Sequence, residues 1–210
     1  MFKMCGRFVI TNPVAKTKSI VKKAINVEDV ENYNAHPYQN LPVIKKYTNG
    51  NTLELLRWGI LPSWSTKKDF KPLINARLET IDEKISFKKN IKLRRCVVVA
   101  DGFYEWKREG KEKTPFYFLR NDKKMIFIAG IFEDNQFCLI TQQAAENVNK
   151  IHHRQPVILN EKDINNYLNL QLDGSNFLKE INKPKLEFYE ISKDVNKPTN
   201  NNISLIQKIN

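Results

Sequence analysis

Short segments rich in β-branched and aromatic residues recur along most of the chain and constrain its fold more than any other feature. Such segments are typical of β-strands. Strands are expected at residues 41–47, 52–60, 96–100, 103–107, 116–119, 125–131, 137–141 and 186–191. Asn121-Asp122 and Asp134-Asn135 separate neighbouring segments, and these polar pairs are predicted to form hairpin turns.

Helices are expected at fewer places. Apolar residues at helical spacing predict helices at residues 14–24, 80–89, 144–150 and 161–171. The first is rich in lysine, the last is expected to begin at Asn160 as its N-cap, and residues 33–37 are expected to form a turn. Because these helices do not alternate strictly with the strands, we predict an α+β fold with largely antiparallel sheets. No linker rich in Gly, Pro or Ser divides the 210 residues, so one domain is expected.

Charge favours a polyanionic partner. The chain has 35 Lys and Arg against 23 Asp and Glu, a net charge of +12. Cationic surfaces bind nucleic acid because neutralising the phosphates releases condensed counterions. Solubility in a proteome rich in Lys and Asn explains the same charge, and composition alone does not separate the two interpretations.

Several classes of protein are excluded on the sequence. The longest apolar runs, such as residues 97–100, are far shorter than the roughly 20 residues of a membrane span. The first residues, MFKMCGRF, lack the apolar core of a secretory signal, so a cytoplasmic location is expected. Cys5, Cys96 and Cys138 are far apart and form no CxxC pair, which argues against a disulfide framework or a structural zinc site.

Cys5 lies between Met4 and Gly6. If translation begins at Met4, removal of that Met leaves Cys5 as the N-terminal residue. An N-terminal cysteine carries an amine with a pKa of about 8 next to a thiol with a pKa of about 8.5. The amine can condense with an aldehyde to a Schiff base, and the thiol can then close a thiazolidine ring. The alternative is a small buried apolar residue.

Two further segments carry polar residues suited to a binding site. If INARLET at 74–80 is a strand, Asn75, Arg77 and Glu79 share one face, where Arg77 can bind a phosphate and Asn75 a substrate oxygen. A surface Arg–Glu pair is the alternative. Glu105 is flanked by aromatic residues, and desolvation there would raise its pKa and suit it to general-acid work. The alternative is an edge-strand Glu paired with Lys107 or a neighbouring lysine.

The remaining candidates are histidines and tryptophans. His152 and His153 are adjacent, without the carboxylate or Cys partners that a metal site needs, so either a proton-transfer role or a place in a turn is expected. Trp58, Trp64 and Trp106 lie among many Lys and Arg residues. Aromatic residues beside cationic grooves bind single-stranded nucleic acid, although most tryptophans belong to the core.

The motifs together resemble one family. They are MCGRF at 4–8, YNAHP at 33–37, RWGILPSW at 57–64, INARLET at 74–80, VVVADGFYEWK at 97–107, IFIAGIF at 126–132, IHHRQPVIL at 151–159 and ISKDVN at 191–196. In this order they resemble the SOS-response-associated peptidase (SRAP) family, whose members shield abasic sites. The resemblance implies an antiparallel barrel-like core with flanking helices and a basic groove.

The resemblance also implies roles for single residues. Cys5 looks like the N-terminal cysteine that joins the ring-opened abasic sugar, Asn75 matches the Asn beside that linkage, and Glu105 the carboxylate that assists ring opening. His152 matches the family's proton-transfer histidine. The DNA-binding residues implied are Arg7 and Arg77 for phosphates, and Pro37, Trp64 and Trp106 for the single-strand channel.

The implied partner is single-stranded DNA with abasic sites, bound by a cytoplasmic, nucleoid-associated monomer that needs no metal or organic cofactor and acts near the replication machinery. Two departures from the family stand out. His153 replaces the usual Asn or Asp, and its charge is expected to shift the pKa of His152. Residues 1–4 precede Cys5 as a leader or a mis-assigned start, with the SRAP-like domain at 5–210.

The leader leaves three explanations open. Translation starts at Met4, the leader is removed autocatalytically, or the protein binds DNA without crosslinking. Two other functions compete with the crosslinking interpretation. One is a noncatalytic module that binds single-stranded DNA through charge and stacking. The other is a cysteine peptidase that uses Cys5, His152 and Glu105 as nucleophile, base and orienting residue.

Overall fold

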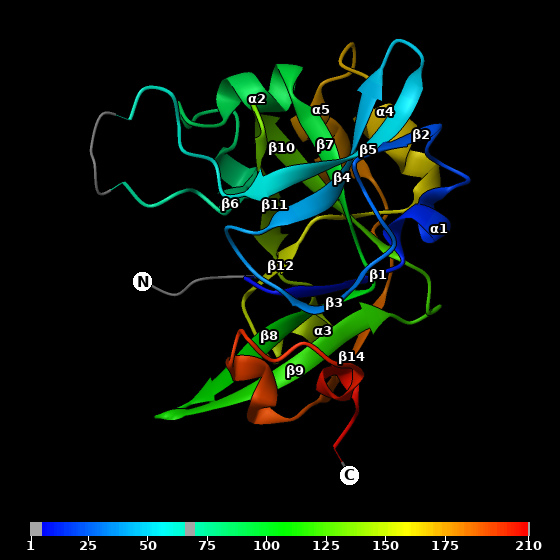
Figure 1. Ribbon diagram of the computed structural model, residues 1–210. Helices are drawn as coiled ribbons and strands as arrows, with labels where there is room; N and C mark the ends of the chain where they lie inside the picture. The colour runs from blue at the N-terminus through cyan, green and yellow to red at the C-terminus, as the bar shows by residue number, and fades with distance from the viewer. Residues whose placement is uncertain (1–5, 66–69, 210) are drawn as a thin grey trace.

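The β-branched segments pair into two sheets in the computed structural model, which describes residues 6–65 and 70–209 (Figure 1). The larger sheet has 9 strands in the order β12-β11-β10-β7-β4-β5-β2, with β13 on β10 and β6 on β11. Its strands are β2 (Lys23–Ile25), β4 (Asn40–Tyr47), β5 (Gly50–Trp58), β6 (Asn75–Arg77), β7 (Arg95–Ala100), β10 (Ile126–Glu133), β11 (Gln136–Gln143), β12 (Arg154–Pro156) and β13 (Ile158–Leu159). A parallel pairing of β11 with β5 closes this sheet into a ring.

The smaller sheet has 5 strands, all antiparallel to their neighbours. Its order is β14 (Leu186–Glu190), β9 (Glu112–Arg120), β8 (Gly102–Glu109), β1 (Phe8–Thr11) and β3 (Glu31–Ala35). β8 therefore lies in the middle of this sheet, between β1 and β9. The predicted α+β fold with largely antiparallel sheets and a barrel-like core is confirmed.

Helices are short and lie around the sheets (Figure 1). They are α1 (Pro13–Thr17), α2 (Lys88–Leu93), α3 (Glu146–Asn149), α4 (Ile164–Tyr167) and α5 (Gly174–Glu180), with 3₁₀ turns η1 (Leu78–Thr80), η2 (Glu161–Asp163), η3 (Lys193–Asn196) and η4 (Ile203–Ile206). Within the described ranges, no helix has the length and apolar character that crossing a membrane requires.

Some local predictions are wrong. The helix expected at 14–24 ends at Thr17, because Lys23–Ile25 instead pairs with β5 as an edge strand. The helix expected at 80–89 is wrong over most of its length, because only Lys88 and Lys89 are α-helical, as the start of α2, and Ile85, which a helical stripe would bury, is 68% exposed. Of the turn predicted at residues 33–37, the first part is the strand β3.

Of the two predicted hairpins, Asp134-Asn135 joins β10 to β11, which pair with each other. Asn121-Asp122 does form a turn, but it leads from β9 in the smaller sheet to β10 in the larger one. The hairpin prediction fails there because neighbouring segments of the chain enter different sheets. The helical segment expected at 161–171 is split into η2 and α4 and ends at Tyr167, with Asn160 at its N-cap position.

Aromatic residues join the two sheets. Phe8 of β1 contacts Trp58 of β5 at a ring-centroid distance of 5.2 Å, and Trp58 stacks on Phe137 of β11 at 6.1 Å. All three side chains are fully buried, so Trp58 belongs to the core.

The C-terminal segment covers the opposite face of the smaller sheet, where Val195 and Leu205 pack on Tyr104 and Tyr117 (Figure 1). Successive residues of β8 therefore face different cores. Phe103 joins the main core and Tyr104 the second one.

Candidate active site

A cavity of about 1010 Å³ opens beside the outer half of β8. Its walls come from the segment entering β1, the turn after β3, the β8–β9 hairpin, the turn before β12 and the end of η3. The residues are Gly6, Arg7, His36, Pro37, Tyr38, Glu105, Trp106, Arg108, Lys113, Asn149, Ile151, His152, His153, Asn196 and Pro198. All three histidines of the chain line this one cavity, so the groups best suited to proton transfer at neutral pH gather here.

Glu105 is buried at the cavity wall. Its side chain is only 3% exposed, although the last residues of the same strand, β8, are exposed to solvent. The edge position and the pairing with Lys107 are wrong, because β8 is a central strand and Lys107 pairs with Glu109 at 2.7 Å. A neighbouring lysine does feel the carboxylate, since Glu105 raises the pKa of Lys113. Glu105 Oε1 instead lies 4.0 Å from Nδ1 of His152. A buried carboxylate next to an imidazole is an arrangement suited to proton transfer.

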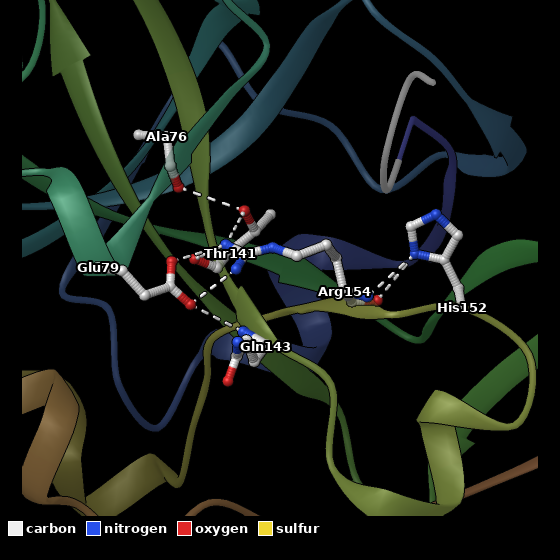
Figure 2. A network of polar contacts seen from close by, with 6 residues as sticks. All are labelled: Ala76, Glu79, Thr141, Gln143, His152 and Arg154. Carbon is white, nitrogen blue, oxygen red and sulfur yellow. Dashed lines mark hydrogen bonds and ion pairs between the residues drawn. The ribbon is translucent and has the colours of Figure 1, made fainter. Parts of the chain in front are cut away.

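The imidazole of His152 is oriented by the backbone of Arg154. The Arg154 N–H donates to Nδ1 at 3.2 Å, and the Arg154 carbonyl oxygen lies 3.1 Å from the same nitrogen (Figure 2). Nδ1 accepts from the N–H when it is bare and donates to the carbonyl when it carries a proton, so either tautomer is held. The ring of His153 lies 4.5 Å away, centroid to centroid.

Burial lowers the pKa of His152, and the nearby positive charges of His153, Arg108 and Arg154 lower it further, against a hydrogen bond to Arg154 that raises it. The lowering by His153 agrees with the shift expected from the sequence. His152 is therefore held in its neutral form over a pH range in which an exposed histidine would already be protonated.

This shift predicts how stability depends on pH. Because the native state binds its proton less readily than the unfolded state, His152 contributes stability above a pH of about 6.5 that is lost as the pH falls through its lowered native pKa. The variant His152→Gln cannot titrate. Urea unfolding from about pH 7.5 down to about pH 5 should therefore show a shallower loss of unfolding free energy in the variant. Parallel curves would contradict the assignment.

Three cations share the cavity with Glu105. Arg108 and Lys113 are opposite each other across the β8–β9 hairpin, and Arg7 enters from β1. Burial and the charges of Arg108 and Arg7 lower the pKa of Lys113, while Glu105 raises it. Three cations face the single carboxylate of Glu105 among the described lining residues, and this excess of positive charge suits the cluster to a phosphate group.

Arg7 and Trp106 are both held by the C-terminal segment. The Arg7 guanidinium donates to the carbonyls of Val195 and Asn196, and Trp106 Nε1 donates to Asn196 Oδ1 at 2.8 Å. The Trp106 ring also has the Arg7 guanidinium 5.7 Å and the Lys113 ammonium 4.5 Å from its centroid. Arg7 thus has a structural role besides its place in the cavity wall.

The other predicted site residues are distributed differently. Pro37 lines the cavity, whereas Asn75, Arg77 and Trp64 are not among its lining residues. Asn75 and Arg77 lie on β6, which pairs in parallel with β11. Trp64 is 49% exposed and packs edge-on against Phe70, 5.6 Å away.

Glu79 does not continue the alternation of β6, because the chain turns into η1 at Leu78. The surface Arg–Glu pair considered for this segment is not formed with Arg77. Glu79 pairs with Arg154 instead.

Cys5 lies outside the described residues. The chain enters the described structure at Gly6, which lines the cavity. Cys96 and Cys138 are buried free thiols, and burial raises the pKa of both, which makes them poor nucleophiles. Within residues 6–65 and 70–209, no group of three or more His, Cys, Asp or Glu side chains is placed to hold a metal ion.

Comparison with known proteins gives the family. The model of the family described as SOS response associated peptidase (SRAP) matches residues 4–198. The chain belongs to the SRAP family.

Its SRAP relatives include the abasic site processing protein YoqW of Bacillus subtilis, 34% identical, with 97% of this chain and 99% of YoqW covered. The abasic site processing protein YedK of Escherichia coli is 30% identical, with 81% of this chain and 82% of YedK covered. A crystal structure of a protein from Bacteroides thetaiotaomicron shares the fold, with a TM-score of 0.80 at 24% identity over 97% of this chain and 98% of that one.

In this SRAP chain, sequence reasoning gave no role of their own to the cavity residues His36, Lys113 and Asn196, and counted Arg108 only among the many cations near the tryptophans. The sequence did carry one signal for Arg108 and Lys113. A tight turn at Gly110 between two strands predicts a hairpin in which these two residues lie opposite each other. No local signal marks Asn196, because it reaches Trp106 only through the packing of the C-terminal segment.

Proposed function

We propose that this chain binds single-stranded DNA in the cavity and forms a covalent thiazolidine crosslink to abasic sites through an N-terminal Cys5, shielding them from strand cleavage. The observation that carries the proposal is the pair of buried Glu105 and half-buried His152 in a cationic cavity whose wall begins at Gly6, next in sequence to Cys5. The names of its relatives, abasic site processing proteins, support the choice of DNA lesion.

The chemistry begins at the abasic sugar. The closed hemiacetal loses its anomeric hydroxyl proton to a base while its ring oxygen gains a proton from an acid, which opens the ring to an aldehyde. The α-amine of Cys5 adds to the aldehyde carbon and the resulting carbinolamine loses one water to give a Schiff base. The Cys5 sulfur then adds to the imine carbon, and the nitrogen takes up the thiol proton. The net change is the loss of one water.

Glu105 and His152 are the groups proposed to move these protons. The neutral imidazole favoured by burial can accept a proton, and the neighbouring carboxylate stabilises the imidazolium that results. Both are held by the fold, Glu105 by a central strand and His152 by the backbone of Arg154. Their fixed positions reduce the entropy lost when the sugar is aligned. Asn75 is proposed to hold the adduct.

Phosphate binding is assigned to the cations, Arg7 and Arg77 together with Arg108 and Lys113, and the aromatic contacts to Trp64 and Trp106, with Pro37 in the channel wall. In the double variant Arg108→Gln/Lys113→Gln, affinity for single-stranded DNA should fall roughly tenfold or more at low salt. The slope of log K against log salt should become shallower by about 1.4 for two lost phosphate contacts.

Fluorescence anisotropy over a salt series checks this expectation. The matched control is Lys89→Gln/Lys92→Gln on α2, where both lysines are exposed and lie outside the cavity lining. It removes the same charge. Equal losses in the two double variants would mean that only net charge matters, and the cavity would lose its assignment as the phosphate site.

A free α-amine at Cys5 requires either a start at Met4 with removal of that Met, or autocatalytic removal of residues 1–4 as a leader from the domain at 5–210. We favour the start at Met4, because the bulky Phe2 hinders ordinary removal of Met1. The acting form is proposed to be a cytoplasmic, nucleoid-associated monomer near the replication machinery, since one chain forms one adduct.

A noncatalytic single-strand-binding module is the second candidate, and the cation cluster of the cavity favours it. The two candidates separate in one experiment. Mixing with an abasic oligonucleotide and then denaturing gives a shifted band only for the covalent reaction. Salt-sensitive binding without that band would leave the binding module.

A further inference from the structure

Arg154 and Glu79 form a two-pronged ion pair behind the cavity. Arg154 Nη1 lies 2.7 Å from Glu79 Oε1, and Nη2 lies 2.9 Å from Oε2. The Arg154 side chain is 7% exposed and that of Glu79 is 42% exposed, so the guanidinium is buried and the carboxylate reaches it from the surface. Two parallel hydrogen bonds fix the relative orientation of both groups, which a single contact would not.

The same ion pair is also hydrogen-bonded to β11 (Figure 2). Arg154 Nη2 also donates to the Thr141 carbonyl at 2.8 Å, and the Gln143 N–H donates to Glu79 Oε1 at 2.9 Å. Thr141 Oγ1 in turn lies 3.4 Å from the carbonyl oxygen of Ala76. β6, η1, β11 and β12 thus meet at one polar cluster, and Ala76 is the residue of β6 between Asn75 and Arg77.

A side-chain clamp matters here because the strands are short. β6 and β12 have 3 residues each; β6 pairs with residues 139–141 of β11, and β12 pairs with residues 141–143 at its end. Three-residue strands form few backbone hydrogen bonds, so their ends open readily unless side chains hold them. Two residues proposed to act on DNA depend on these strands, since Asn75 is the first residue of β6 and His152 lies two residues before β12.

From this geometry we infer that Glu79 and Arg154 are a positioning pair, which holds β6 against the turn that presents His152 and thereby aligns the two sides of the site. The inference rests on the proposed function for the reaction that is aligned. The connection runs from the Glu79 carboxylate to the Arg154 guanidinium, and from the Arg154 backbone to the imidazole. The Arg154 guanidinium is 7% exposed and bonded to Glu79 and to the Thr141 carbonyl, so the pair is assigned an indirect action on the sugar, through the backbone that holds His152.

The pair also influences the proton affinity of His152. The charged groups that face this imidazole are Glu105 and Arg108 from β8, its neighbour His153, and Arg154. Of these, the positive charge of Arg154 lowers the pKa of His152. Glu79 offsets that charge, so removing its carboxylate should lower the pKa of His152 further.

Glu79→Gln tests the inference by histidine NMR. With three histidines in the chain, the imidazole signals can be assigned with His36→Gln and His153→Gln variants and titrated in the intact protein. We expect the His152 titration to move to lower pH in Glu79→Gln. Crosslinking of an abasic oligonucleotide should slow by about tenfold, as expected for a misplaced reacting group. Its pH–rate profile should move in the same direction as the titration.

The matched control is Asp82→Asn. Asp82 is 41% exposed, three residues from Glu79, and lies 3.8 Å from Lys179 on α5, away from the cavity. Its titration and rate should equal those of the wild type. Glu79→Asp keeps the charge and shortens the side chain, so its titration should stay near that of the wild type while its rate falls between the two. This variant keeps the test decisive if Glu79→Gln fails to fold.

A Glu79→Gln protein with the wild-type His152 titration and the wild-type rate would overturn the inference. So would an Asp82→Asn protein that changes as much as Glu79→Gln. Failure of the proposed function looks different, because the wild type itself would then form no adduct. The NMR titration would still decide in that case whether Glu79 is coupled to His152.

Discussion

Cys5→Ala is expected to abolish the DNA adduct that survives denaturation while leaving a Schiff base that borohydride can trap. The variant keeps an α-amine at residue 5, so condensation with the aldehyde still proceeds. It lacks the sulfur that closes the five-membered ring, so the imine remains open to hydrolysis. Cys5 is thus assigned two separable functions, one for each nucleophile.

Denaturing gels with and without borohydride check this expectation, with a single-stranded abasic oligonucleotide as substrate. Cys138→Ala is the control for loss of a cysteine elsewhere, because the Cys138 thiol is buried in β11. It should retain the adduct if it folds. A Cys5→Ala protein that forms a heat-stable adduct as well as the wild type would refute the thiazolidine. That result would not support a peptidase role for Cys5 either.

Glu105→Gln is expected to slow formation of the adduct by about 10² to 10⁴-fold. The amide has nearly the same shape, so packing in the centre of the smaller sheet is preserved while the proton-transferring group is lost. Binding of an intact oligonucleotide without an abasic site should change little, or strengthen, since a carboxylate is removed from a cavity lined by Arg7, Arg108 and Lys113.

Single-turnover rates at saturating DNA measure this effect without interference from affinity. Glu109→Gln is the matched control, because Glu109 lies on the same strand and is 68% exposed. Within the described residues, its one ion pair is with Lys107, at 2.7 Å. Its rate should equal that of the wild type. A Glu105→Gln rate within about twofold of the wild type would remove Glu105 from the chemistry.

Most strands could be predicted from the sequence because their β-branched and aromatic residues are buried whichever neighbours they pair with. Residues 96–100 and 137–141 lie within β7 and β11 for this reason. Helices were less predictable. The apolar pattern at 14–24, for example, includes residues that form the edge strand β2 on β5. Which sheet a strand joins depends on distant partners, as the turn between β9 and β10 shows.

The candidate site was predictable to a similar extent. Glu105 and His152 could be found because aromatic neighbours or an unusual pair of histidines mark them, and they prove to be 4.0 Å apart. The Glu79–Arg154 pair joins residues 75 positions apart, and no local pattern specifies that distance. Asn196 was likewise out of reach, because its contact with Trp106 depends on how the C-terminal segment packs on the smaller sheet.

The central claim is a covalent bond between Cys5 and the abasic sugar, and intact-mass spectrometry tests it most directly. The protein is expressed in cells and measured before and after mixing with an abasic single-stranded oligonucleotide. We predict a chain that begins at Cys5 and gains the mass of the oligonucleotide minus one water. A chain that keeps Met1, Phe2 and Lys3 and gains no mass would contradict the account and leave only a DNA-binding module.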